Sequence, residues 1–212
     1  VKNLNICRGF LTDDWSKELK LCDVFVHCAS EGVVTNQDDW EKCFNTNFIE
    51  TNQIITNAFK SGIKKFIICS SCFEYGSSGD EYEKIPINAM LKPTTPYGFS
   101  KAASSLFALD FAKKHNLKVI IPRFFHLYGN GSHKMGFWSR LVEAARTDSD
   151  FEMTLGNQIR NFSTVDFAVS KLLDIAKNID RYKYGGVVKN IGSNNNMSLL
   201  SFAQSEWLRL NA

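Results

Sequence analysis

The stretch TTPYGFSKAA, residues 94–103, sets a tyrosine and a lysine four positions apart at the expected start of a helix. Pro96 suits the first helical turn, and residues four apart share one helical face, so Tyr97 and Lys101 are expected to be neighbours. A nearby ammonium group favours the phenolate form of a tyrosine, whose pKa is otherwise about 10. A bare Tyr-x-x-x-Lys spacing is more often an ordinary exposed pair, so the rest of the chain must decide.

The composition is that of a folded domain that binds small molecules. The chain has 212 residues, 44% of them hydrophobic, which is enough for one well-buried domain. Its net charge of +3 is small, and its basic residues are spread among acidic ones, so no nucleic-acid partner is expected. The longest apolar runs have the length of strands, far short of a membrane span, and no signal peptide precedes them. We therefore expect no membrane partner and a cytoplasmic location.

The six cysteines lack the regular spacing of a disulfide framework. They are expected to be reduced thiols, and Cys28 and Cys69, which end apolar strands, to be small buried residues. Cys69 and Cys72 form a CSSC sequence, but no second Cys or His pair stands at ligand spacing. Neither a metal site nor redox catalysis is expected from that sequence.

Strand-like apolar runs alternate with helix-length amphipathic segments along the chain. The expected strands cover residues 23–29, 64–70, 117–124 and 186–192. The expected helices cover residues 38–61, 97–115, 136–147 and 165–178, with a last one from about Ser198. A short run, FEMTL at 151–155, lies between the third and fourth of them. This alternation predicts an α/β fold, a Rossmann-like doubly wound parallel sheet with helices on both faces.

Polar residues follow the expected strands, at the sheet edge where doubly wound folds bind ligands. The segments there read HCASEG, CSSCFEYG, PRFFHLYG and NIGSNNN. A serine of the second segment can meet the Tyr97–Lys101 pair at this edge. A phenol that moves a proton, a hydroxyl that polarises an oxygen and an ammonium that tunes the phenol suit carbonyl/alcohol interconversion. Hydride transfer needs a cofactor, because no side chain carries hydride.

Seven stretches occur in a family order along nearly the whole chain: DVFVHCAS, NFIET, GIKKFIICSSCFEYG, PYGFSK, PRFFHLYGNG, IRNFSTVD and NIGSNNNMSLL. With them the sequence resembles the extended short-chain dehydrogenase/reductase family, nucleotide-sugar epimerases, dehydratases and ketoreductases typified by UDP-galactose 4-epimerase. The resemblance implies hydride transfer at a sugar carbon with NAD or NADP, in activated-sugar biosynthesis such as that of surface polysaccharides. It also implies a partial NAD(P)-binding Rossmann domain over 1–123 and a mainly substrate-binding region over 124–212, with strand 186–192 returning to the sheet.

The resemblance assigns catalytic roles to four residues. Tyr97 is implied as the acid/base, Lys101 as its pKa-lowering, ribose-binding partner, and Ser71 as the hydrogen-bond donor to the substrate oxygen. Asn47 resembles the asparagine that supports the site from the long helix. The implied cofactor-binding residues are Cys28, Ala29, Ser30, Cys69, Ser70, Tyr97, Lys101, Pro122 and Arg123. The implied contacts to a nucleotide-diphosphate sugar are Ser71, Cys72, His126 and Arg160, the last through its fit to phosphate oxygens.

Two departures from the family pattern shape the expectation. The 4,6-dehydratases carry an acidic pair where this chain has Cys72 and Phe73, which leaves epimerase or 4-ketoreductase. His126 stands where many epimerases have an asparagine near the sugar nucleotide. The family also often dimerises through the helices that correspond to 38–61 and 97–115, which implies a homodimer.

The family's glycine-rich G-x-x-G-x-x-G turn, which holds the pyrophosphate, and the residue that reads the ribose are not found in this sequence. We therefore expect a fragment that lacks about 50 residues of that unit. The choice between NAD and NADP stays open. The alternative is an inactive fragment or a binding module that retains only the sugar-nucleotide half.

Overall fold

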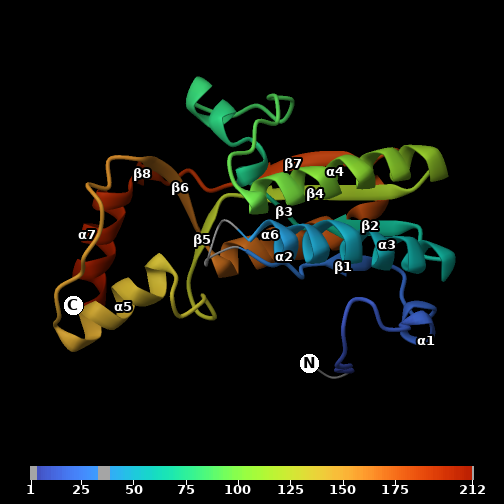
Figure 1. Ribbon diagram of the computed structural model, residues 1–212, viewed down its shortest axis with the longest axis horizontal. Helices are drawn as coiled ribbons and strands as arrows, with labels where there is room; N and C mark the ends of the chain where they lie inside the picture. Colours follow the sequence, from blue (N-terminus) through green and yellow to red (C-terminus); the bar gives the residue numbers. More distant parts are fainter. Residues whose placement is uncertain (1–3, 33–38, 212) are drawn as a thin grey trace.

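The computed structural model describes residues 4–32 and 39–211, and its main sheet is parallel throughout (Figure 1). Its strands are β1 (Phe25–His27), β2 (Lys65–Ile68), β4 (Lys118–Phe124) and β7 (Val187–Ile191). They lie in the order β1-β2-β4-β7. A two-residue strand, β3 (Ser70–Ser71), pairs with the end of β4 in the register that β2 keeps, so it continues β2 past Cys69.

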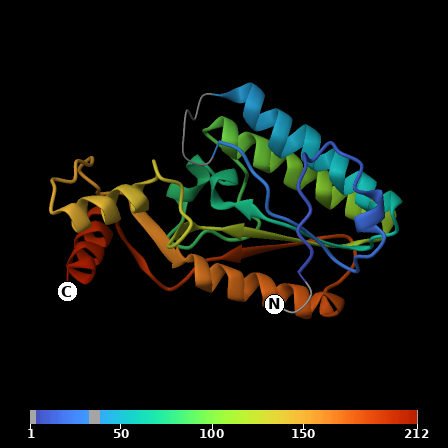
Figure 2. The same cartoon turned by 90° about the horizontal axis from the view of Figure 1, so that it is seen from below.

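Helices cover both faces of this sheet, so the expected doubly wound arrangement is confirmed. Figure 2 shows α3 (Thr51–Lys60) and α4 (Pro96–His115) on one side and α6 (Val165–Lys177) on the other. Alternate strand residues supply the two cores. Phe66, Ile68, Val119 and Ile121 pack with α3 and α4, whereas Ile67, Ile120 and Ile191 pack with the α6 side.

The segment expected as one helix over 38–61 is three helical pieces. Asp38 lies outside the described residues. The pieces are α2 (Trp40–Phe44), a π-helical segment η1 (Asn45–Glu50) and α3. Asp39 caps the first by accepting from the Lys42 backbone N–H at 2.9 Å. A π-helical segment inside a helix is rare and often marks a functional site, and this one carries Asn47.

A second sheet, which the sequence analysis did not anticipate, builds a small lobe with two helices (left in Figure 1). Its strands are β5 (His126–Tyr128), β6 (Ile159–Thr164) and β8 (Asn196–Ser198), and its helices are α5 (Phe137–Thr147) and α7 (Leu199–Leu210). Phe162 and Phe202 stack at its centre with ring centroids 3.9 Å apart. The FEMTL run at 151–155 forms no strand; the strand comes later, at β6.

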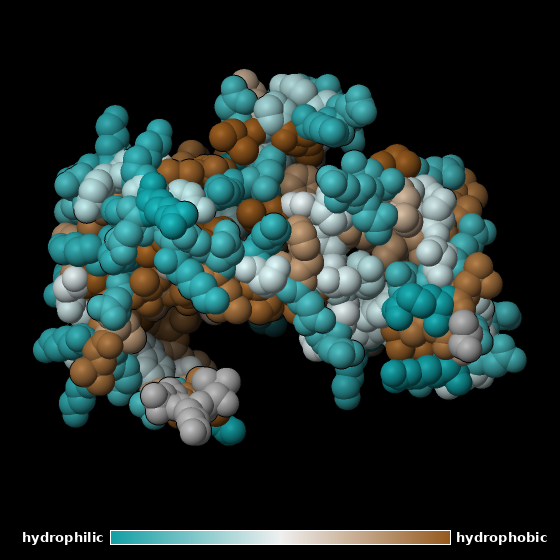
Figure 3. Space-filling model, turned by 180° about the vertical axis from the view of Figure 1, so that it is seen from behind, coloured by the Kyte–Doolittle hydropathy of each residue, from teal (hydrophilic) through white to brown (hydrophobic). Residues whose placement is uncertain are grey.

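Short helices complete the described chain: α1 (Ser16–Leu19) and the 3₁₀ turns η2 (Cys72–Glu74), η3 (Ser77–Glu81) and η4 (Ile179–Arg181). Hydrophilic side chains are spread over the face seen in Figure 3, with apolar patches between them. Within the part of the chain that the structure describes, none of the helices has the length and apolar composition to cross a bilayer.

Candidate active site

Tyr97 and Lys101 lie in the first turns of α4, as the sequence predicted. The helix begins at Pro96, and Thr95 caps it by accepting from the Gly98 backbone N–H at 3.1 Å. Gly98 lets the helix approach the turn that follows Ser71, because a Cβ there would stand 2.6 Å from the Phe73 carbonyl oxygen. Tyr97 is thereby held beside the end of β3.

The Lys101 side chain is buried and points to the sheet. Its Nζ donates to the Cys69 carbonyl oxygen at 2.7 Å, where the β2 line of pairing is interrupted. Burial lowers the pKa of this ammonium, and the neighbouring Cys69 and Glu74 oppose that shift. The lysine therefore fastens α4 to the strand end on which the candidate site stands.

The Tyr97 phenol lies beside the hydroxyl groups of Ser71 and Ser30, which act to lower its pKa. Burial outweighs them and raises the pKa of Tyr97 above its ordinary value. In this structure the Lys101 ammonium donates to the Cys69 carbonyl and burial raises the pKa of Tyr97, so the lowering of that pKa by Lys101 stays a prediction. A phenol in this setting is a protonated group at neutral pH.

The two serines of β3 have different partners. Ser71 faces Tyr97, and its Oγ also accepts from the Phe73 backbone N–H at 3.2 Å, which caps η2. Ser70 instead donates to the buried Glu74 carboxylate and lies 3.2 Å from Ser105 Oγ. Ser71 is thus the one that is available to a ligand beside the phenol.

Asn47 is buried and uses both ends of its amide. Its Oδ1 accepts from the Glu31 backbone N–H at 2.8 Å and from Ser30 Oγ at 3.2 Å. Its Nδ2 donates to the Glu31 carbonyl at 2.9 Å and to Ser100 Oγ at 3.0 Å. Ser100 Oγ in turn donates to the Tyr97 carbonyl oxygen at 2.9 Å. The asparagine therefore joins the segment after β1 to the first turn of α4 without touching the phenol.

Three of the expected substrate contacts gather beside Ser71. Burial raises the pKa of the Cys72 thiol to about 12 and lowers that of His126 to about 4, and the Arg160 charge acts on both. Arg160 itself is exposed. Within the described residues, His126 Nδ1 is a buried atom without a hydrogen-bond partner. These side chains come from η2, β5 and β6, so the small lobe brings a cation to the rim of the main sheet.

Residues 2–192 match the sequence profile of the NAD dependent epimerase/dehydratase family. The chain belongs to this family. The expected resemblance is confirmed, because epimerases and dehydratases of nucleotide sugars recur among both the curated and the structural relatives.

Three relatives show which kinds of protein in this family the chain is similar to. The structure of MoeE5 in complex with UDP-glucose and NAD superposes with a TM-score of 0.84 at 28% identity, covering 96% of this chain and 68% of that one. The dTDP-D-glucose 4,6-dehydratase of Mus musculus is 24% identical over 192 residues, which are 88% of this chain and 52% of the relative. The putative UDP-arabinose 4-epimerase 2 of Arabidopsis thaliana is 28% identical over 129 residues, 59% and 29% of the two chains. The chain thus spans about half the length of the mouse relative and less of the plant one.

The residues expected to hold the cofactor in this family lie at or near the ends of the parallel strands. Cys28, Ala29 and Ser30 follow β1, and all three are exposed, so Cys28 is not the buried residue that was expected. Cys69 is half-buried. Pro122 is buried within β4, opposite Lys189 of β7.

Arg123, expected at the nicotinamide side, has partners inside the protein. Its Nε donates to Glu74 Oε2 at 2.7 Å, and its Nη1 donates to Tyr75 Oη at 2.8 Å. Tyr75 Oη then donates to Asn190 Oδ1 at 2.7 Å, while Ser105 Oγ donates to Glu74 Oε1 at 2.5 Å. A cofactor contact by Arg123 stays a prediction; in this structure its guanidinium neutralises a buried carboxylate.

Glu74 is the residue that sequence reasoning missed. It is fully buried, next to the buried Tyr75. The available signal was an acidic residue inside an otherwise apolar and hydroxyl-bearing segment, SSCFEYG, because a buried carboxylate requires a cationic partner. Across the described ranges, no three His, Cys, Asp or Glu side chains lie together as metal ligands would.

Proposed function

We propose that this chain carries the catalytic rim of an NAD(P)-dependent nucleotide-sugar epimerase or 4-ketoreductase. The observation that supports this most is the Tyr97 phenol, which lies beside Ser71, with Lys101 of the same helix buried against the carboxyl end of β2. A phenol and a hydroxyl directed to one point suit a sugar carbonyl or alcohol oxygen.

The residues present fit the ribose and nicotinamide half of a dinucleotide. The Lys101 ammonium has three N–H donors, and the structure describes one hydrogen bond from it, to the Cys69 carbonyl. A buried ammonium with spare donors suits ribose hydroxyls. Ser30 and the strand end at Cys28 would line the same molecule. When bound, the dinucleotide supplies the hydride acceptor or donor that side chains lack.

Proton transfer is assigned to Tyr97. Because burial raises its pKa, the phenol is protonated at neutral pH and can give its proton to a sugar oxygen that becomes an alcohol. Ser71 donates a hydrogen bond to the same oxygen and stabilises the charge that develops there. In the reverse direction the phenol must first lose its proton, and the Lys101 charge then favours the phenolate.

The substrate proposed is a nucleotide-diphosphate sugar, held with its diphosphate on Arg160. An exposed guanidinium beside the rim suits phosphate oxygens, which it can bind through two parallel hydrogen bonds. His126 and Cys72 would line the sugar. No carboxylate stands at Cys72 or Phe73, and the Phe73 ring packs edge-on to Tyr97 at 5.7 Å, so a sugar-dehydrating acid/base pair is not assigned.

A homodimer through α2, α3 and α4 completes the proposal. Apolar side chains are exposed along α2, η1 and α4: Trp40, Ile49, Phe99 and Leu106. Trp40 and Phe99 contact each other across the two helices, with ring centroids 5.3 Å apart. An apolar face of this kind is typical of a protein interface.

The test uses the complete protein encoded by the reading frame that contains this chain. Absorbance of the reduced nicotinamide is followed with UDP-, dTDP- and CDP-sugars and their 4-keto forms. Consumption of NADH or NADPH identifies a ketoreductase, and sugar interconversion without net cofactor change identifies an epimerase. Calorimetric binding of a sugar nucleotide without any dinucleotide binding would instead favour a binding module and overturn the proposal.

A further inference from the structure

Cys28 and Cys69 face each other at the ends of two neighbouring strands. The last registered pair of β1 and β2 is His27 with Ile68, so these cysteines stand one step beyond it, and the Cys69 backbone N–H donates to the His27 carbonyl at 2.9 Å. Their Sγ atoms are 3.4 Å apart.

This separation is small enough for a covalent bond with little movement. Neighbouring strands lie about 4.8 Å apart, which is inside the ~4.4–6.8 Å range of Cα separations that disulfides span. The two sulfur atoms need to approach by only about 1.3 Å to reach the bonded distance. Side-chain rotation supplies such a movement without displacement of the sheet.

The two thiols differ chemically in the way that a reactive pair requires. Cys28 is exposed, and the hydrogen bond that it shares with Cys69 lowers the pKa of its thiol to about 7, with help from the Lys101 charge and against the effect of burial. The same hydrogen bond, together with burial, raises the pKa of Cys69. Because Cys28 is exposed and Cys69 is half-buried, Cys28 is the thiol that a dissolved oxidant reaches first.

We propose that Cys28 and Cys69 are a peroxide-sensitive thiol pair that closes to a disulfide across the rim of the sheet. The Cys28 thiolate attacks one peroxide oxygen, the O–O bond breaks, and hydroxide leaves as water after protonation, which gives Cys28 sulfenic acid. Cys69 Sγ then attacks that sulfur; the S–S bond forms, the S–O bond breaks, and hydroxide leaves with the Cys69 proton as a second water. Two thiols are oxidised by two electrons, and one peroxide is reduced.

The disulfide acts on the candidate site through Cys69. Its carbonyl oxygen is the acceptor for Lys101 Nζ, and Cys28 begins the segment that leads to Ser30. Closing the pair draws these strand ends together and occupies the surface beside Lys101. The thiol chemistry itself does not depend on the proposed reaction, whereas its effect on dinucleotide binding does.

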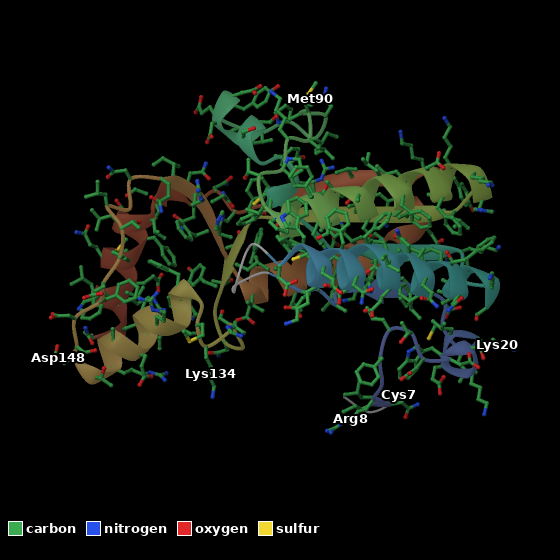
Figure 4. All side chains as sticks on the ribbon, viewed as in Figure 1. Cys7, Arg8, Lys20, Met90, Lys134 and Asp148 are labelled. Atoms are coloured by element: carbon green, nitrogen blue, oxygen red, sulfur yellow. The ribbon has the colours of Figure 1, made fainter. Side chains whose placement is uncertain are left out.

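The other cysteines supply controls. Burial raises the pKa of Cys43 and of Cys72, so both are poor nucleophiles. Cys7 is exposed on the N-terminal segment that precedes α1, apart from the strand ends (Figure 4). Cys7→Ser thus removes a thiol without altering the pair.

The complete, reduced protein is treated with increasing hydrogen peroxide, alkylated without reductant, digested and mapped by mass spectrometry. We expect a crosslinked peptide pair that joins Cys28 to Cys69, loss of two of the six alkylatable thiols and full recovery with dithiothreitol. Cys7→Ser should keep the crosslink, and Cys28→Ser and Cys69→Ser should each abolish it.

Three results would overturn the proposal: a crosslink between Cys69 and Cys72 instead, oxidation of Cys28 to sulfinic acid without a crosslink, or six thiols that remain alkylatable. The wild-type map decides by itself, so a variant that fails to fold does not weaken the test. If the crosslink forms and dinucleotide affinity is unchanged, the thiol pair stands and its link to the candidate site is withdrawn.

Discussion

Asn47 Nδ2 donates to Ser100 Oγ at 3.0 Å, and this bond ties the π-helical segment η1 to the first turn of α4. The extra residue that a π-turn inserts is what brings Asn47 inward, between the segment after β1 and the helix that carries Tyr97. The asparagine therefore holds the turn that carries Tyr97, the proposed acid/base.

Replacing Asn47 by Ala should lower turnover more than it weakens substrate binding, because it loosens the Tyr97 turn without removing a ligand contact. It also removes two hydrogen bonds to the Glu31 backbone, each worth about 0.5–1.5 kcal/mol of unfolding free energy. Steady-state kinetics and urea unfolding measure both effects. Asn45→Ala, on the exposed face of the same segment, is the matched control, and equal effects in the two variants would contradict the positioning role.

Tyr97→Phe in the complete protein should reduce kcat by about 10²–10⁴-fold, since it deletes the group that moves the proton. Folding stability and dinucleotide affinity should change little, because the ring and its packing remain. Kinetics, thermal unfolding and dinucleotide titration make the comparison, with Tyr82→Phe, at an exposed tyrosine, as the control. Near-normal turnover of Tyr97→Phe would remove this residue from the mechanism.

Glu74→Gln should destabilise the protein by about 3–5 kcal/mol, because it leaves the buried Arg123 charge without its counter-ion. Urea unfolding gives the free energy. Glu81→Gln breaks a 2.6 Å ion pair with Lys92 at the surface and should cost only about 0–1 kcal/mol. If both variants lose the same small free energy of unfolding, the Glu74–Arg123 ion pair does not stabilise the fold more than a surface pair does.

Acid should destabilise the fold through His27 and His126. Burial lowers the pKa of each to about 4, below the usual value near 6.5 that the unfolded chain restores. Between about pH 6.5 and 4 the unfolded chain binds more protons, so the stability that is present above pH 6.5 falls as pH drops, by roughly 3 kcal/mol per histidine. His126→Gln should flatten the pH dependence of urea unfolding, and the exposed His133→Gln should not. If unfolding free energy depends on pH in the same way in the wild type and in both variants, His126 does not cause the loss of stability in acid.

Alkylation of Cys28 by iodoacetamide should rise with pH and reach half its maximal rate near pH 7, because the thiolate replaces the thiol there. The groups that face this thiol are the Cys69 thiol, 3.4 Å away, and the Lys101 ammonium. Cys69→Ala should move the midpoint upward, since the hydrogen bond that favours the thiolate is lost. Peptide-resolved mass spectrometry reads the rate, and an unmoved midpoint would show that Cys69 is not the cause.

The main sheet was predictable because its strands are continuous apolar runs, such as KFII and KVII, buried on both faces between amphipathic helices. In the small lobe the helices α5 and α7 were expected from the sequence as well, but the sheet was not. Its strands IRNFST and NMS are short and polar, and each finds its place only through a partner far along the chain, as Phe162 does through Phe202. Local patterning carries no record of such contacts.

In the candidate site, too, some features could be predicted from the sequence and others could not. Tyr97, Lys101 and Ser71 could be picked out by residue type and position, and the structure places Tyr97 beside Ser71 and Lys101 against Cys69. The direction of the Tyr97 pKa and the partner of Arg123 depend on burial and on Glu74, 49 positions before Arg123 in the chain, so no spacing rule predicts them.

Gly98 has no functional group, yet the approach of Tyr97 to Ser71 depends on it. A methyl group at this position would meet the Phe73 carbonyl at 2.6 Å and push the start of α4 away from the strand end. A mutational scan would therefore score position 98 as if it were a catalytic residue, although its contribution is the room left by a missing side chain. The distance between the Tyr97 phenol and Ser71 therefore depends on steric space at position 98, a residue that takes no part in any proposed chemical step.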